Sequence, residues 1–139
     1  MGRYFNLLFF FLLFLFVSCQ NDGYIGNLYG QWRLDSSCVD GVTKENENLY
    51  LSFQGQVVMA RSVNDKSHST NDVAGGFVQK DDSLFMVFYQ PNSYTTPHHL
   101  IEQKFRFEDS GNVRLYILSL SDSKMCLSSG NDKWLFSKY

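Results

Sequence analysis

The sequence predicts an all-β protein, built as a single antiparallel up-and-down barrel of about eight strands behind an N-terminal signal segment. From residue 28 onward, apolar and polar side chains alternate with a period of two, which is the period of a strand. Gly, Asn and Asp residues separate the alternating stretches at short intervals. No stretch after residue 27 shows a convincing helical pattern. Residues 28–139 are therefore expected to form one β-domain, and their number suits a single core.

An unbroken apolar run, Leu7 to Val17, lies near the start of the chain behind Arg3. A membrane-spanning helix needs roughly 20 such residues, so this run is too short to be one. A helix packed on the core of a small domain would show a polar face to solvent, and the run has none. A short apolar run behind a basic residue at the N-terminus is typical of a signal peptide. Residues 1–18 are therefore expected to be a signal peptide.

The end of this run carries a short motif. Phe16-Val17-Ser18-Cys19 resembles the lipobox of bacterial lipoproteins, with Phe16 in place of the usual Leu. The resemblance implies that the signal peptide is removed before Cys19 and that the Cys19 thiol carries a diacylglyceryl group. Two or three acyl chains such as palmitate would anchor the protein firmly to a lipid membrane. Residues 19–27 would then be the lipidated cysteine and a polar tether.

Asp22 follows the cysteine closely. An acidic residue at such a place resembles the surface-export signal of Bacteroidetes lipoproteins. The resemblance implies a lipid anchor in the outer membrane. The sequence is compatible with a protein on the periplasmic side of this membrane and with one on the cell-surface side.

The alternating stretches predict the individual strands. In the first strand, Trp32 and Leu34 share one face while Gln31 and Arg33 share the other. Gly75-Gly76 suggests a bulge or a sharp bend within its strand. The predicted strands comprise residues 28–34, 48–53, 56–63, 73–79, 83–90, 103–107, 113–117, 124–127 and 134–139.

The first and last strands carry a second resemblance. Gly30-Gln31-Trp32, together with Trp134 to Lys138 at the chain end, resembles lipocalin-like domains. The hairpin sequence of residues 118–127 is also similar to small bacterial lipocalin-like proteins. The resemblance implies that Gly30, Trp32 and Lys138 close one barrel end, with Lys133 as the second choice for the basic residue. The Thr-Asp-Tyr motif of other lipocalins is absent.

Two cysteines remain besides Cys19. Cys38 and Cys126 could form a disulfide, which persists in the oxidising compartment that an exported protein enters. They could equally be two separate buried thiols, because free cysteine is commonly buried.

The sequence offers little catalytic or metal-binding chemistry. His68, His98 and His99 lack the spacing of converging metal ligands and are expected to be solvated loop residues. Asp81-Asp82 and Glu108-Asp109 lie beside turn residues, where Asp bonds the backbone. No nucleophile elbow, phosphate loop or dinucleotide motif is present, so we expect neither an enzyme nor a cofactor. The formal net charge of −2 without a basic cluster argues against a nucleic-acid partner.

One tripeptide resembles a modification site. Asp82-Ser83-Leu84 is similar to the O-glycan acceptor of Bacteroidetes proteins, which implies a glycan on Ser83.

The favoured function is a membrane-anchored, non-catalytic binding module for a small apolar or amphipathic ligand. Small eight-stranded barrels are filled by side chains or hold one small ligand. The mouth loops would be residues 38–47, 64–72 and 90–99. Several apolar residues are expected to point into the barrel and are candidates for lining a ligand, although each is also compatible with an ordinary core position. These inward candidates are Leu34, Leu51, Phe53, Phe77, Phe88, Phe107, Leu115 and Ile117.

The alternative function is an interaction or structural protein of the cell envelope, with a solid core and no ligand. Residues 83–90 are apolar on both faces, which leaves Phe85, Val87 and Tyr89 as an outward patch for an envelope protein partner.

Overall fold

The computed structural model describes residues 26–89 and 97–139. The predicted signal peptide, Cys19 and most of the tether lie outside the described residues, as does most of the predicted loop 90–99. No helix of the described residues is long and apolar enough to span a membrane.

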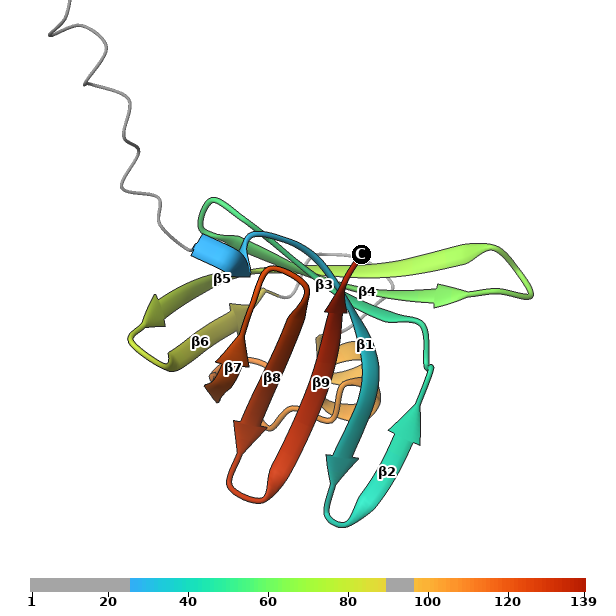
Figure 1. Cartoon of the computed structure of the whole chain (residues 1–139). Coiled ribbons are helices and arrows are strands. Elements are labelled where there is room, and N and C mark those ends of the chain that lie inside the picture. Colours follow the sequence, from blue (N-terminus) through green and yellow to red (C-terminus); the bar gives the residue numbers. More distant parts are fainter. Residues whose placement is uncertain (1–25, 90–96) are drawn as a thin grey trace, which may run out of the picture.

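The described chain is a closed antiparallel β-barrel (Figure 1). From β3 to β9, neighbouring strands in the sequence are hydrogen-bonded neighbours in the sheet, and the first strand, β1, pairs with β2, with β3 and with the last strand, β9. The strands are β1 (Gly30–Val39), β2 (Val42–Glu45), β3 (Leu49–Gln54), β4 (Val57–Asn64), β5 (Ser69–Lys80), β6 (Ser83–Phe88), β7 (Val113–Leu120), β8 (Lys124–Ser129) and β9 (Asp132–Lys138).

Strand β1 has three partners. Its first half pairs with β3, its second half pairs with β2 on the same edge, and its other edge pairs with β9. A register shift between Leu34 and Ser36 bends it where the partner changes. Eight strands therefore close the barrel and β2 is an extra strand, which confirms the predicted fold class.

The alternation of side chains determines the core. Buried residues alternate with more exposed ones along β3, β4 and β6 and over the first six residues of β7, as expected for a barrel whose outer face meets solvent. All eight inward candidates are buried in one apolar cluster: Leu34, Leu51, Phe53, Phe77, Phe88, Phe107, Leu115 and Ile117.

The up-and-down order gives the barrel two different ends. The closing end carries the β3–β4, β5–β6 and β7–β8 turns and a short 3-10 helix, η1 (Gly26–Leu28). The open end carries the β1–β2, β4–β5 and β8–β9 turns. The predicted mouth loops 38–47 and 64–72 both lie at the open end, although each contains strand residues.

The prediction of a strand at residues 103–107 is wrong. A π-helix, η2 (His98–Lys104), occupies this region, and the amide of Phe105 bonds the carbonyl of Leu100 five residues earlier. The helix is stabilised because Leu100 and Ile101 bury their side chains in the barrel. Phe105 and Phe107 are both buried, but Arg106 between them has a φ of 63° and does not continue a strand.

Of the two alternatives predicted at Gly75-Gly76, a bulge or a sharp bend, the bulge is wrong. Strand β5 pairs without a register shift with β4 on one side and with β6 on the other. A Cβ atom at Gly75 would lie 2.3 Å from the Val87 carbonyl oxygen. Glycine is therefore needed here because the β6 backbone approaches closely, not because the strand bulges.

Candidate functional site

The closing end brings together the three residues that the sequence predicted there. Trp32 is fully buried, and its indole N–H donates to the Leu28 carbonyl oxygen at 2.9 Å. The Lys138 ammonium lies 4.2 Å from the centre of the Trp32 ring and donates to the carbonyls of Asn27 and Tyr29. Burial lowers the pKa of Lys138. Gly30 has a φ of 116°, and a Cβ atom there would lie 3.0 Å from Lys138 Cε.

Helix η2 covers the open end, and Figure 1 shows it behind β1 and β9. Leu100, Ile101 and Phe105 are buried in the barrel. The Trp134 indole N–H donates to the Phe105 carbonyl at 2.7 Å, and Lys104 donates to the Ser62 hydroxyl at 2.9 Å. These contacts join the helix to β9 and β4, so the interior is filled from this end.

Glu102 holds the helix to the segment that follows it. Its carboxylate accepts the Ser110 amide at 3.0 Å and contacts His98 Nδ1 at 2.7 Å. The bonds from Ser110 and His98 lower the pKa of Glu102 to about 2, with the Ser110 amide as the largest cause. The carboxylate therefore stays charged at neutral pH and holds residues 98–110 as one unit.

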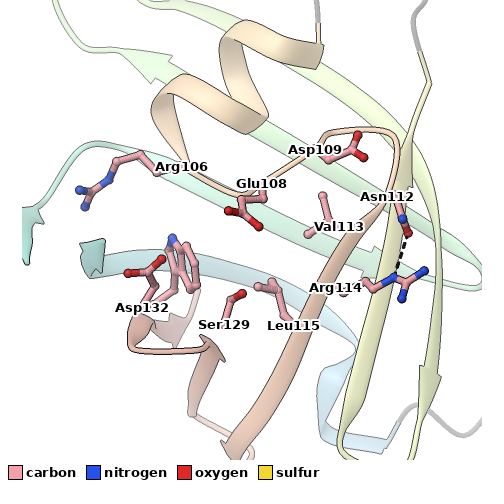
Figure 2. A pocket seen from close by; sticks show the side chains of 10 residues that line it. Arg106, Glu108, Asp109, Asn112, Val113, Arg114, Leu115, Ser129 and Asp132 are labelled. Carbon is pink, nitrogen blue, oxygen red and sulfur yellow. Dashed lines mark hydrogen bonds between the residues drawn. The ribbon is translucent and has the colours of Figure 1, made fainter. Parts of the chain in front are cut away.

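A pocket of about 440 Å³ lies at the open end, between the segment after η2, strand β7 and the β8–β9 turn. In Figure 2, Ser129, Leu115 and Asp132 lie below the segment that carries Glu108 and Asp109. Val113, Leu115 and Trp134, each at most 3% exposed, form the apolar base of the pocket, and charged and polar side chains provide the rest. The lining residues are Arg106, Glu108, Asp109, Asn112, Val113, Arg114, Leu115, Ser129, Asp132 and Trp134.

Each arginine of this pocket has a partner within the protein, but the buried Arg106 Nε has none among the described residues. The Arg106 guanidinium donates to the carbonyls of Ser37 and Val42, each at 3.0 Å, and so joins the pocket segment to β1 and β2. Arg114 donates to the Asn112 side chain at 3.2 Å, which Figure 2 marks. The two arginines lie at opposite sides of the pocket.

The carboxylates that line the pocket accept few hydrogen bonds from the protein. One oxygen of Asp109 accepts the Gly111 amide, and one oxygen of Asp132 accepts the Asp40 amide. Within residues 26–89 and 97–139, the exposed Glu108 carboxylate has no hydrogen bond or ion pair. The carboxylates of Glu108 and Asp132 therefore retain oxygens that can accept from a ligand.

Only one of the eight inward candidates, Leu115, lines this pocket. The other seven pack in the barrel, where Phe53 and Phe77 lie 4.9 Å apart and Phe107 and Trp134 lie 5.1 Å apart between ring centres. The sequence indicated only turn positions for Glu108 and Asp109. It also missed Arg106, Arg114 and Asp132, because their approach depends on the pairing of β7, β8 and β9.

The structure leaves Cys38 and Cys126 as free thiols. Cys38 pairs with Lys133 on one edge of β9, and Cys126 pairs with Leu135 on the other edge. Two strand spacings of about 4.8 Å place their Cα atoms roughly 9 Å apart or more. A disulfide needs less than about 7 Å. The structure therefore contradicts the disulfide alternative, because β9 separates the two cysteines.

The remaining predicted residues lie on the surface. His68 is in the β4–β5 turn, whereas His98 and His99 are exposed on η2 and not in a loop, which corrects their predicted setting. Ser83 is the half-buried first residue of β6. In the part of the chain that the structure describes, no three metal-binding side chains converge.

One wall of the barrel is apolar on its outside. Seven of the ten large hydrophobic side chains that are exposed among the described residues belong to it. It includes the predicted Phe85, Val87 and Tyr89, with exposed fractions of 37%, 43% and 62%. We call these seven residues the outer wall: Val57, Val78, Phe85, Val87, Tyr89, Tyr116 and Leu118.

Barrel closure between β1 and β9, a tryptophan closing one end and a pocket at the other define a small up-and-down barrel of the lipocalin class. The chain belongs to the family described as Lipocalin-like domain, whose family model matches residues 13–139.

Two solved structures share this fold. A lipocalin-like protein from Bacteroides uniformis ATCC 8492 is 20% identical, with a TM-score of 0.69 over 82% of this chain and 100% of that chain. An uncharacterized protein from Bacteroides eggerthii DSM 20697 is 23% identical, with a TM-score of 0.68 over 81% of this chain and 99% of that chain. A search of curated proteins finds no match.

Proposed function

We propose that the protein is a non-catalytic binding module for a small amphipathic ligand, which it holds at the open end of the barrel. The observation that carries this proposal is the pocket of about 440 Å³, where a charged rim meets the apolar surface of Val113, Leu115 and Trp134. Ligand pockets of about 300–1,000 Å³ with a few polar groups are typical of small-molecule sites. The filled interior disfavours a wholly apolar ligand threaded along the barrel axis.

The free carboxylate oxygens indicate the polar part of the ligand. The two terminal nitrogens of Arg106 bond carbonyls within the protein and its buried Nε has no partner among the described residues, whereas Glu108 and one oxygen of Asp132 face the pocket as acceptors. A positively charged ligand group, such as an ammonium, would bond these carboxylates. The apolar body of the ligand would then lie against Val113 and Leu115.

The proposed module is tethered to the membrane. The lipobox resemblance supports acylation of Cys19, which would place the barrel on a lipid membrane, with the outer membrane as the proposed site. Fatty-acid labelling tests this anchor, since Cys19→Ala should remain unlabelled. Normal labelling of that variant would refute it.

Native mass spectrometry of the full-length protein from its own host tests the pocket. We expect a reproducible extra mass in the small-molecule range. The double variant Glu108→Gln with Asp132→Asn should lose this mass, whereas Asp81→Asn at the closing end should retain it. A clean mass without ligand, or equal retention by all variants, would contradict the proposed site.

The alternative function is an interaction protein of the cell envelope that uses the outer barrel surface. The exposed Phe85, Val87 and Tyr89 favour it, because contiguous exposed apolar area marks interfaces. The outer wall and the pocket are separate surfaces, so the two functions are compatible.

A further inference from the structure

We infer that the outer wall docks on the surface of the lipid bilayer that carries the acyl anchor. This inference rests on the proposed acylation of Cys19. It concerns a surface that is separate from the ligand pocket, and it commits to lipid as the occupant of that surface.

The pairing register makes the outer wall continuous. Val57 faces Gly76, which faces Val87, and in the next row Val78 faces Phe85. A Cβ atom at Gly76 would lie 3.1 Å from the Tyr89 hydroxyl oxygen, so Tyr89 reaches over this glycine. Within β4, β5 and β6 these two rows carry no charged side chain, and the second row ends at Arg114 of β7 beside Phe85.

The chain enters the barrel at the end nearest this surface. The described residues begin with η1 at the closing end, and Gly30 pairs with Phe53 of β3. Only β3 separates β1 from β4, so Val57 lies about 10 Å from Gly30 across two strand spacings. The wall thus begins close to the point where the tether joins the fold.

The length of the tether restricts where the membrane can be. Seven residue steps separate Cys19 from Gly26, and an extended chain covers at most about 3.5 Å for each step. An acyl anchor on Cys19 therefore lies within roughly 25 Å of η1. At this distance the bilayer is always within reach of the wall, and tethering gives even a weakly binding surface a high effective concentration.

The border of the wall suits a lipid surface. Lys80 is exposed on the closing-end side of the apolar rows, where it pairs with Ser83, and Arg114 is exposed on β7 directly beside Phe85. Basic side chains beside an apolar surface favour anionic headgroups. Tyr89 and Tyr116 add aromatic rings with a polar tip, which favour the membrane interface.

A tryptophan reporter tests the docking in the full-length acylated protein. Val87→Trp places the reporter on the wall, and Leu135→Trp is the matched control, because Leu135 is 47% exposed on β9 at the opposite side of the barrel. Each variant is placed in vesicles of phosphatidylethanolamine and phosphatidylglycerol that carry brominated acyl chains. Bromine should reduce the added Val87→Trp emission at least about twofold and leave the Leu135→Trp emission unchanged.

A second substitution separates specific docking from general proximity. Phe85→Asp in the Val87→Trp protein should abolish the quenching, whereas Leu135→Asp should not. Equal quenching of both reporters, or of neither, would overturn the inference. If neither reporter is quenched and cross-links form between copies, the occupant of the outer wall is a second copy of the chain. If quenching requires added envelope protein, the occupant is a protein partner. Either result would also overturn the inference.

Intact mass distinguishes failure of the anchor from failure of the docking. An unmodified Cys19 would overturn the proposed anchor and this inference together. An acylated Cys19 with an unquenched Val87→Trp reporter would overturn the docking alone.

Discussion

The Lys138 ammonium lies 4.2 Å from the centre of the Trp32 ring, and the two residues together close one end of the barrel. Lys138 also donates to two carbonyls of the segment that leads into β1. The last strand thereby binds the beginning of the first at the place where the sheet closes. Because this contact joins the two ends of the domain, its loss should affect the whole barrel.

Replacing Lys138 with Met should lower the free energy of unfolding by about 2 kcal/mol, since it removes a cation–π contact and two charge-assisted hydrogen bonds. Lys133→Met is the matched control, because Lys133 is exposed on the same strand and should change stability by less than about 0.5 kcal/mol. Urea unfolding followed by fluorescence measures both variants. Equal effects would show that the contact with Trp32 does not stabilise the fold.

Gly75→Ala should destabilise the protein by about 2–3 kcal/mol, because the added methyl group meets the β6 backbone. At Gly76 the nearest atom to an added Cβ is the Tyr89 hydroxyl oxygen at 3.1 Å, which belongs to a side chain that can move. Gly76→Ala should therefore cost less than about 1 kcal/mol. Thermal or urea unfolding of both variants checks this order, and the reverse order would contradict the close approach of β5 and β6.

Acid should loosen the open end of the barrel. The pKa of Glu102 is about 2 in the folded protein and 4.5 without its partners. Because the folded value is the lower one, this carboxylate stabilises the fold above pH 4.5, and the contribution is lost as pH falls toward 2. Glu102→Gln should be less stable than wild type at neutral pH and nearly equal to it at pH 2. Unfolding curves over this range, with Glu108→Gln as control, test the prediction.

Cys38 and Cys126 should both react as thiols in the denatured, unreduced protein. We expect alkylation to add two labels to the mature chain, because β9 lies between these residues and Cys19 is proposed to be blocked by its acyl group. Intact mass before and after labelling counts the additions. No label at either cysteine would indicate a disulfide and contradict the strand register.

The fold class could be predicted from local patterns. Alternation of apolar and polar residues places Leu51 and Phe53 on the inner face whatever the strand pairs with, because the side chains of a strand point alternately to its two faces. The resemblance of Gly30 and Trp32 to lipocalin-like domains predicted Lys138 as the basic residue that packs near Trp32. Because Trp32 lies in the first strand and Lys138 in the last, the resemblance also predicted a barrel that closes between these two strands.

Helix η2 could not be predicted in the same way. Residues 103–107 alternate for only five positions, and such a short pattern is compatible with a strand and with a helical turn. The choice depends on distant partners: Leu100 and Ile101 fill the open end, and Trp134 bonds the carbonyl of Phe105. Burial in the barrel decided this segment against the local pattern.

The all-β class and the inward residues follow from the side-chain period of the sequence, and the pair at the closing end follows from its resemblance to lipocalin-like domains. The separation of Cys38 from Cys126, the pocket and the continuity of the outer wall come from the tertiary structure. These features depend on which strands are neighbours and in what register. Residues 106–114 and 129–134 are separated in the chain, and the pairing of β7, β8 and β9 together with the hydrogen bonds of Phe105 and Arg106 brings them to one pocket.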